Sequence, residues 1–112
     1  MAGPWNQAQI ESARTVSFVC ALDFLGAYYK VDPDYVPLDP GRKSRRVHVS
    51  YAGRDYRFVF TGEKFVNELL PVAADNRGGG GAIDLIRHIT GLGFVQVVKV
   101  CLDARASQIE RK

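Results

Sequence analysis

The sequence predicts an α+β fold with one N-terminal helix, a three-stranded antiparallel sheet and two C-terminal helices. Apolar residues recur at helical spacing over residues 18–25, and apolar and polar residues alternate over residues 46–51 and 56–61. Two further helical patterns follow a run of four glycines and cover residues 82–90 and 94–104. The order of these patterns along the chain gives the α+β class.

Length and composition indicate a single domain. The chain has 112 residues, enough to bury a modest core without a metal or a disulfide, and its 46% hydrophobic and 24% charged residues are typical of a globular protein. We expect a flexible or helical arm over residues 1–15, the domain over residues 16–105 and a polar, fraying tail over residues 106–112. Because no apolar run is long enough to span a bilayer and no secretory signal opens the chain, we expect a cytoplasmic protein without membrane contact.

The N-terminal segment carries clear helix signals. Residues 7–14 are polar with good helix formers, and predict either a short amphipathic helix or a frayed arm. Ser17 is a suitable N-cap for a helix over residues 18–25, and Gly26 is suited to end it. The apolar residues of this helix cover more than one face, which indicates burial on more than one side. Three prolines between residues 33 and 40 then force an extended or turning loop.

The central segment predicts a β-hairpin with its turn at residues 52–55. Phe58 and Phe60 lie on one face of its second strand and are expected in the core. The short run over residues 65–70 fits either a third strand or a turn of helix, because periodicity cannot separate the two over six residues. Pro71 ends it.

The glycines at residues 78–81 run directly into a helical pattern. Because glycine carries a large entropic cost in a helix or a packed strand, we expect a turn there, with a phosphate-binding loop as the alternative. Asp84 is expected to cap the helix and to bond back to the loop amides, and His88, four residues later, is placed to pair with it. Gly91 suits the left-handed position that ends the helix.

Charge is distributed unevenly along the chain. Residues 1–40 contain two basic and five acidic side chains, whereas residues 41–64 contain seven basic and two acidic ones. A local basic field attracts polyanions, and basic groups interleaved with aromatic rings on a sheet are typical of single-stranded nucleic acid binding. A solvated surface hairpin is the alternative. The candidate nucleic-acid-binding residues are Arg42, Lys43, Arg45, Arg46, His48, Tyr51, Arg54, Tyr56, Arg57, Lys64 and Arg77.

Three motifs carry a family resemblance: Thr-Gly-Glu-Lys-Phe at residues 61–65, Gly-Gly-Ala-Ile-Asp-Leu-Ile at residues 80–86 and Gly-Leu-Gly-Phe at residues 91–94. Together they resemble the zinc-binding domain of bacterial, phage and plasmid primases. The likeness covers roughly residues 16–102. The paired ligands of that family are absent and only His48 stands near one of their positions, so the chain is most similar to the cysteine-less version found beside Toprim domains in mobile-element primase-like proteins.

The resemblance implies a zinc-ribbon-like sheet without metal and a function in binding single-stranded DNA or template. The domain would then be a non-catalytic accessory part of a primase or of a DNA replication or transfer system of a mobile element. Its expected partners are single-stranded DNA and a Toprim or polymerase-type primase or helicase subunit. A protein interaction module without nucleic acid contact is the main alternative, and a small hydrolase or nucleotide-binding protein that uses the glycine loop is a weaker one.

The sequence offers no catalytic or metal-binding pattern. There is no nucleophile motif, and the four Cys and His residues, Cys20, Cys101, His48 and His88, lack the paired spacing of zinc ligands. We therefore expect no enzymatic activity, no metal and no cofactor. Both cysteines lie within apolar helical patterns and are expected to be buried, reduced and slow to react.

Overall fold

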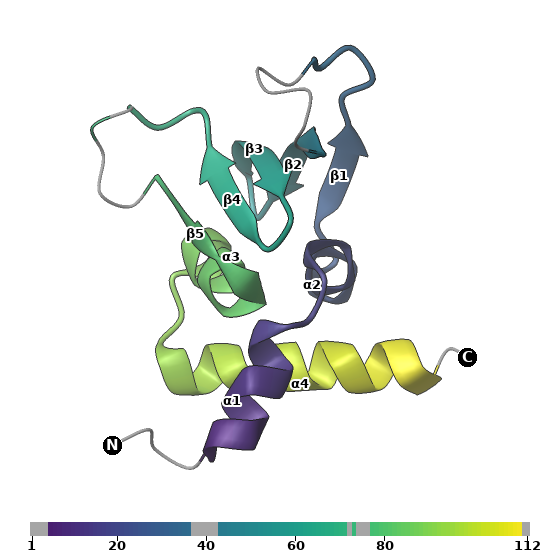
Figure 1. Cartoon of the computed structure of the whole chain (residues 1–112), viewed down its shortest axis with the longest axis vertical. Coiled ribbons are helices and arrows are strands. Elements are labelled where there is room, and N and C mark those ends of the chain that lie inside the picture. Colours follow the sequence, from purple (N-terminus) through teal and green to yellow (C-terminus); the bar gives the residue numbers. More distant parts are fainter. Residues whose placement is uncertain (1–4, 37–42, 72, 74–76, 111–112) are drawn as a thin grey trace.

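The computed structural model describes residues 5–36, 43–71, 73 and 77–110 (Figure 1). Within these residues it contains four helices and one five-stranded antiparallel sheet. The elements, in chain order, are α1 (Gln7–Arg14), α2 (Phe18–Leu25), β1 (Tyr28–Val31), β2 (Ser44–Tyr51), β3 (Arg54–Thr61), β4 (Lys64–Asn67), β5 (Gly78–Gly80), α3 (Gly81–Thr90) and α4 (Phe94–Glu110).

The sheet is a meander in which every strand pairs with its neighbours in sequence, in the order β1-β2-β3-β4-β5. The α+β class is confirmed, but the expectation of three zinc-ribbon-like strands is wrong. The strand alternative for residues 65–70 is confirmed for residues 65–67, which lie in β4, while residues 68–70 lie beyond the strand and β1 and β5 are additional strands. Both extra strands have four residues or fewer, too short for alternation to reveal them, and they form through pairing with β2 and β4.

Three of the four glycines, Gly78–Gly80, form a packed strand and Gly81 begins α3, which corrects the expectation of a plain turn. Gly78 and Gly79 pair with Val66 and Phe65 of β4. A Cβ at Gly78 would collide with the Phe65 carbonyl oxygen, and one at Gly79 would lie 2.9 Å from the Asp84 carboxylate. These two positions therefore require glycine despite its entropic cost, because a side chain would prevent strand β5 from approaching β4 and α3.

The helices cover one face of the sheet in two layers (Figure 1). Helices α2 and α3 lie against the sheet, and α1 and α4 cross each other beyond them. Among the described residues no helix covers the opposite face. This arrangement divides the core into two clusters, one between the sheet and helices α2 and α3, and one among the four helices.

Helix α2 belongs to both clusters, as the width of its apolar face predicted. Its Phe18 and Leu22 pack against the sheet, and its Cys20 and Ala21 pack against the other helices. The predicted ends of the helix are confirmed: the Ser17 hydroxyl accepts a hydrogen bond from the Cys20 amide, and Gly26 is left-handed with φ of 73°. Local capping signals were sufficient because they involve only neighbouring residues.

Aromatic rings fill the cluster beneath the sheet. Phe58 is fully buried and Phe60 is 5% exposed, which confirms their expected place in the core. The Phe18 and Phe60 ring centroids lie 4.5 Å apart, and Phe65 meets Phe58 edge to face at 5.6 Å. Offset and edge-to-face pairs of this kind add to the energy gained from burial.

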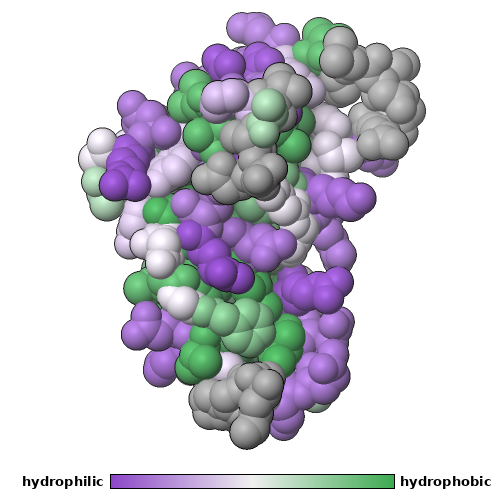
Figure 2. Space-filling view, turned by 90° about the vertical axis from the view of Figure 1, so that its left-hand side faces the viewer, coloured by the Kyte–Doolittle hydropathy of each residue, from purple (hydrophilic) through white to green (hydrophobic). Residues whose placement is uncertain are grey.

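The first helix is packed rather than frayed, so the helical alternative for residues 7–14 is confirmed. Asn6 and Gln9 form a reciprocal capping box at its start, and Arg105 of α4 donates to the Ser12 carbonyl near its end. The Trp5 indole donates to the Val95 carbonyl at 2.9 Å. Figure 2 views this side of the molecule and shows hydrophobic side chains gathered at the height of α1 and α4.

Helix α4 continues to Glu110, so the expected end near Ala104 is wrong, and of the tail expected to fray over residues 106–112 the part up to residue 110 is helical. Residues 111–112 lie outside the described residues. Contacts with α1 and α2 stabilise this helix. The polar composition of its C-terminal residues gives no sign of such contacts in the sequence. No single helix in the described part of the chain reaches the length and hydropathy needed to cross a membrane. Helices α3 and α4 reach them only when counted together, across a bend of 115°.

We predict that Gly78→Ala destabilises the domain by about 1–3 kcal/mol, because the new methyl group meets backbone that cannot move aside. The matched control is Gly80→Ala. That glycine has φ of −133°, and a Cβ there would lie 3.6 Å from the Glu63 carbonyl oxygen, so its cost should stay below about 1 kcal/mol. Urea unfolding of both variants measures the difference, and equal stabilities would contradict the packed-strand account.

The two cysteines are predicted to react slowly in the native protein. Both are buried, and burial, with a smaller contribution from Cys20, raises the pKa of the Cys101 thiol to about 12. Since the thiolate is the reactive form, a disulfide reagent should modify Cys101 at neutral pH only as fast as the domain unfolds. Labelling rates with and without denaturant, read by mass spectrometry, test this, and complete labelling of native protein within seconds would contradict it.

Candidate nucleic-acid interface

The β2–β3 hairpin positions most of the predicted binding residues. Its turn is the two-residue segment Ala52–Gly53, with φ of 51° and 78°, a left-handed pair that suits the twist of a hairpin. Eight residue pairs follow it, from Tyr51↔Arg54 to Ser44↔Thr61. Because side chains alternate along a strand, this register sends the basic residues of one hairpin to two opposite faces of the sheet.

The predicted binding residues therefore do not form one continuous site in the structure. Arg46, His48 and Arg57 share the face without helices, as expected. Lys43 and Arg45 extend on the other side at the start of β2, where both are exposed. Arg54 lies at the opposite end of the hairpin, beside a hollow also lined by Arg87.

The remaining predicted residues have varied environments. Tyr56 is a candidate binding residue whose ring is expected to stay exposed beside the turn, but it packs in the core cluster beneath the sheet and its hydroxyl donates to the Ile89 carbonyl, so that expectation is wrong. Tyr51 is half-buried against the aromatic cluster, and Lys64 is exposed on β4. The Arg77 Nε donates to the Leu70 carbonyl at 3.3 Å. Arg42 lies outside the described residues.

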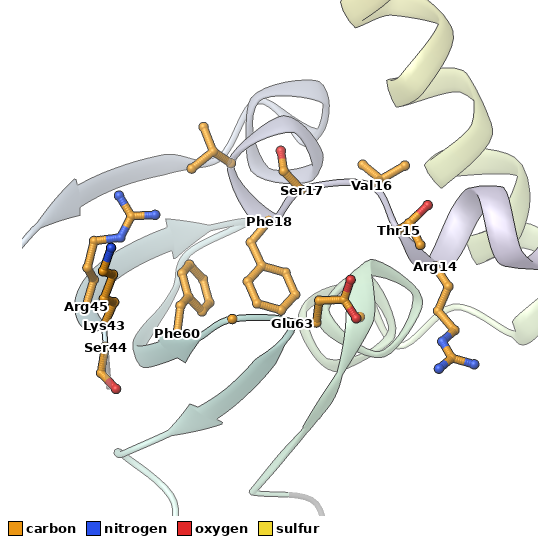
Figure 3. Close-up of a pocket in the computed structure, with 13 residues that line it drawn as sticks. Arg14, Thr15, Val16, Ser17, Phe18, Lys43, Ser44, Arg45, Phe60 and Glu63 are labelled. Carbon is orange, nitrogen blue, oxygen red and sulfur yellow. The ribbon is translucent and has the colours of Figure 1, made fainter. Parts of the chain in front are cut away.

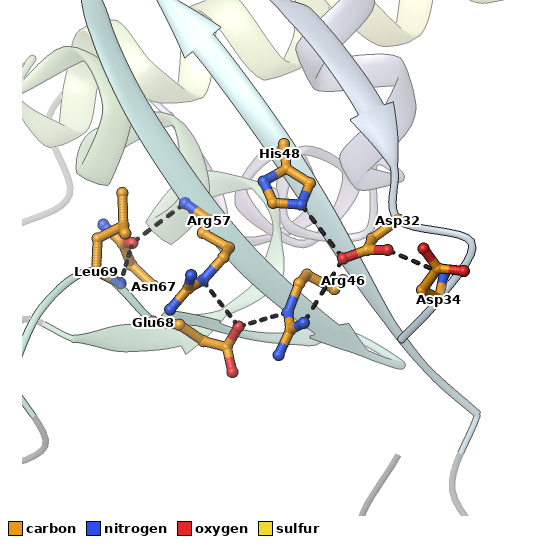
Figure 4. Close-up of polar contacts among 8 residues, drawn as sticks. All are labelled: Asp32, Asp34, Arg46, His48, Arg57, Asn67, Glu68 and Leu69. Carbon is orange, nitrogen blue, oxygen red and sulfur yellow. Dashed lines mark hydrogen bonds and ion pairs between the residues drawn. The ribbon is translucent and has the colours of Figure 1, made fainter. Parts of the chain in front are cut away.

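A charge network occupies the face without helices (Figure 4). The Arg46 Nε donates to Glu68 Oε1 at 2.8 Å, and its Nη1 lies 3.6 Å from Asp32 Oδ2. Asp32 Oδ2 also lies 3.4 Å from His48 Nε2. Glu68 Oε1 also lies 3.3 Å from Arg57 Nε, without forming a hydrogen bond. Arg46 is thus neutralised by neighbouring acids, and this face is close to charge balance.

The network also shifts the ionisation of its members. The hydrogen bond from Glu68, reinforced by its charge and by Asp32, raises the pKa of Arg46. The Asp34 amide, donating to Asp32, lowers the pKa of that carboxyl group, and His48 and Arg46 add to the effect. The sequence pattern did not indicate Asp32 or Glu68 as members of this network, because Asp32 lies in the proline-rich loop and Glu68 in a segment that fits either a strand or a helical turn.

Asn67 and His88 form a polar pair under the sheet. The Asn67 carbonyl oxygen accepts from the Leu69 and Arg57 amides at 3.1 and 3.4 Å, so its amide nitrogen faces His88 Nε2, 3.1 Å away. His88 Nε2 must then be an acceptor, which places the ring proton on Nδ1 and leaves the imidazole neutral. Burial lowers the pKa of His88 in agreement. With Nε2 occupied, the ring lacks a free base for catalysis.

The glycine run has little left with which to bind phosphate. Gly80 donates its amide to Asp84 Oδ2 at 3.1 Å, which confirms the predicted bond back to the loop, and Gly81 donates to the Glu63 carbonyl at 2.6 Å. The Asp84 carboxylate itself stands at the helix start and would repel an anion. The predicted Asp84–His88 pair is not formed, because each side chain has another partner.

A pocket with basic ends lies where α1 meets α2 (Figure 3). It has a volume of about 640 Å³ and is lined by Arg14, Thr15, Val16, Ser17, Phe18, Val19, Lys43, Ser44, Arg45, Phe60, Gly62, Glu63 and Gly81. Figure 3 shows Lys43 and Arg45 side by side at one end and Arg14 at the other, with the rings of Phe18 and Phe60 between them. We call this the basic pocket. It combines anion-binding ends with an apolar floor.

The described residues contain no cluster of three or more His, Cys, Asp or Glu side chains placed to hold a metal ion. No family model, curated protein or solved structure matches this chain. The resemblance to primase zinc-binding domains, and the function that it implies, therefore stay predictions from the sequence.

We predict that the domain loses stability as the pH falls below 6.5, the ordinary pKa of histidine. Because the pKa of His88 is lowered in the folded state, the unfolded chain binds more protons in this range, and acid favours unfolding. Urea unfolding at about pH 7.5 and about pH 5.5 measures the loss. His88→Gln should reduce it and His48→Gln should retain the His88 contribution, whereas an unchanged loss in His88→Gln would contradict the assignment.

Proposed function

We propose that this domain binds single-stranded DNA, without strong sequence preference, through the basic pocket and the adjacent edge of the sheet. The observation that carries the proposal is the position of Lys43 and Arg45. Both are exposed at one end of the apolar pocket, and none of the ion pairs among the described residues involves them. Phosphate groups are natural partners for unpaired cations beside an apolar surface.

The distribution of charge favours this end of the hairpin, rather than the other surfaces, as the DNA-binding site. Residues 43–64 carry six basic and two acidic side chains, but Asp32 and Glu68 neutralise Arg46, and Glu68 also lies beside Arg57. Arg14, at the far end of the pocket, pairs with Glu11 at 3.4 Å and with no other acidic residue in the described part of the chain, and both side chains are more than half exposed. Such surface pairs contribute little and open readily to a competing anion.

The biological role follows the family resemblance described above. We propose that the domain is a non-catalytic accessory part of a primase, or of a DNA replication or transfer system of a mobile element. In that setting it would hold single-stranded template for a Toprim or polymerase-type partner. His88 Nε2 accepts the hydrogen bond from the Asn67 amide nitrogen and is not free to act as a general base, which supports a binding role over hydrolysis at this residue.

A second candidate is a protein interaction module, and the edge strand β1 favours it. Tyr28 and Val31 are 70% and 43% exposed there, and Phe24 of the neighbouring α2 is 41% exposed. Strand β1 pairs with β2, and no described strand pairs with its other edge. An extended segment of a partner protein could add to this edge.

We predict that a labelled oligonucleotide of mixed sequence binds weakly and with strong salt dependence. If Arg14, Lys43, Arg45 and Lys64 each meet one phosphate, the slope of log affinity against log salt should be about −3. The double variant Lys43→Glu, Arg45→Glu should abolish most of the binding in a fluorescence anisotropy titration. Both side chains are exposed, so its fold should remain intact.

The charge-matched control is the double variant Arg54→Glu, Arg87→Glu, which makes the same change in net charge at the other end of the hairpin. It should retain most of the affinity. Arg46 is unsuitable for the test because a glutamate there would face Asp32 and Glu68 and disturb the fold. Equal losses in both doubles would indicate a diffuse field, and no binding by the wild type at low salt would favour the β1 edge and the interaction module.

A further inference from the structure

The polar groups around the basic pocket divide into those already bonded and those still available. The Ser17 hydroxyl accepts from the Cys20 amide, the Ser44 hydroxyl bonds Thr61 Oγ1 at 2.7 Å, and Thr15 donates to the Glu11 carbonyl. These hydroxyls serve the fold itself. Recognition of a ligand is therefore left to the cations at the two ends, the Glu63 carboxylate and the apolar floor.

The floor is an apolar surface of aromatic and aliphatic side chains, in which Val19, 38% exposed, is the most accessible member. Phe18 and Phe60 are 8% and 5% exposed, with Val16 beside them at 6%. Arg45 pairs in register with Phe60, so its aliphatic stem starts next to that ring while its guanidinium remains exposed. A flat group that entered the pocket would have apolar side chains below it and the planar guanidinium of Arg45 within reach.

The ends of the floor carry charge of the same sign. Figure 3 shows Lys43 and Arg45 at one end, Arg14 at the other and Glu63 between them. A ligand that matches this order has an anion, a flat apolar body and a second anion. One internal unit of a nucleic acid strand has this order, because each nucleoside lies between two phosphates.

We propose that the basic pocket binds a single nucleotide unit of the strand, with its base against the apolar floor of the pocket and its flanking phosphates at the two basic ends. This inference rests on the proposed function and adds to it a defined subsite. Glu63 lies where it can accept a hydrogen bond from the amino group of a base, as carboxylates do from cytosine. The pocket should thus prefer a base with an exocyclic amine over thymine.

An acidic peptide fits the pocket less well. Peptides that bind along a sheet add to a free strand edge. Strand β3, which supplies Phe60 to the floor, is paired on both sides, whereas β1 pairs with Val47–Ser50 of β2 and does not reach the part of β2 that lines the pocket. The lining hydroxyls are engaged in the bonds described above and leave few partners for a peptide backbone. The favoured occupant is consequently recognised through charge and stacking, which is how single-stranded nucleic acid is held.

The test uses deoxyadenosine 3′,5′-bisphosphate as the probe and follows the amide signals of the isotope-labelled protein by NMR. The expected shifts map to residues 15–19, 43–45 and 60–63. The bisphosphate should bind at least about tenfold more tightly than deoxyadenosine 5′-monophosphate, which has only one of the two phosphate groups, and far more tightly than the uncharged nucleoside.

Two matched variants distinguish binding in the pocket from attraction by the overall charge of the protein. Val19→Asp places a carboxylate in the pocket lining, in the first turn of α2 where the helix dipole favours it, and should lower the affinity for the bisphosphate about tenfold. Val95→Asp makes the same change in the first turn of α4, outside the pocket, where the side chain is similarly exposed. It should leave the affinity unchanged.

The outcomes distinguish this inference from the proposed function. Oligonucleotide binding without bisphosphate shifts in the pocket would overturn the nucleotide subsite and leave DNA binding standing. Inorganic phosphate that binds as tightly as the bisphosphate would reduce the site to an anion site and overturn the role of the floor. A blocked acidic peptide that shifts the pocket signals while the bisphosphate does not would overturn the inference in favour of protein docking, and failure of every nucleic acid probe would overturn both proposals.

Discussion

The close approach of strand β5 to its neighbours is the constraint on which the rest of the fold depends. At Gly78 the chain passes against the Phe65 carbonyl, and at Gly81, with φ of 81°, an added Cβ would lie 2.9 Å from Arg14. Without side chains at these positions the chain turns directly from the edge of the sheet into α3. Helix α3 is then held between the sheet and the outer helices, and Asp84 closes the junction by accepting from Gly80.

The two helices next to the sheet connect the two parts of the core. Helix α3 contributes Leu85 and Ile89 to the aromatic cluster and Ile83 and Ile86 to the helical one, as α2 does with its own residues. Neither cluster can be completed without these helices. The packing of the sheet and the packing of the α1–α4 layer thus both depend on α2 and α3, and a substitution in strand β5 should destabilise both.

Strand geometry, rather than composition, decides which cations remain available. The hairpin is the most basic segment of the chain, but the alternation of side chains divides its charges between two faces. On one face Asp32 and Glu68 arrive from neighbouring segments and neutralise Arg46. On the other, Lys43 and Arg45 remain exposed at the end of an apolar pocket, and this surface supports the proposed contact with a nucleic acid strand.

The sequence by itself determined the features that depend on near neighbours. Capping residues such as Ser17, Gly26 and Gly91 located helix ends, and alternation located the hairpin, because these signals act within a few residues. Tertiary structure alone decided that glycines form a strand, that Tyr56 is buried and that Asn67 meets His88. Each of these features depends on contact with a segment distant in the chain, and no local pattern of residues predicts such a contact.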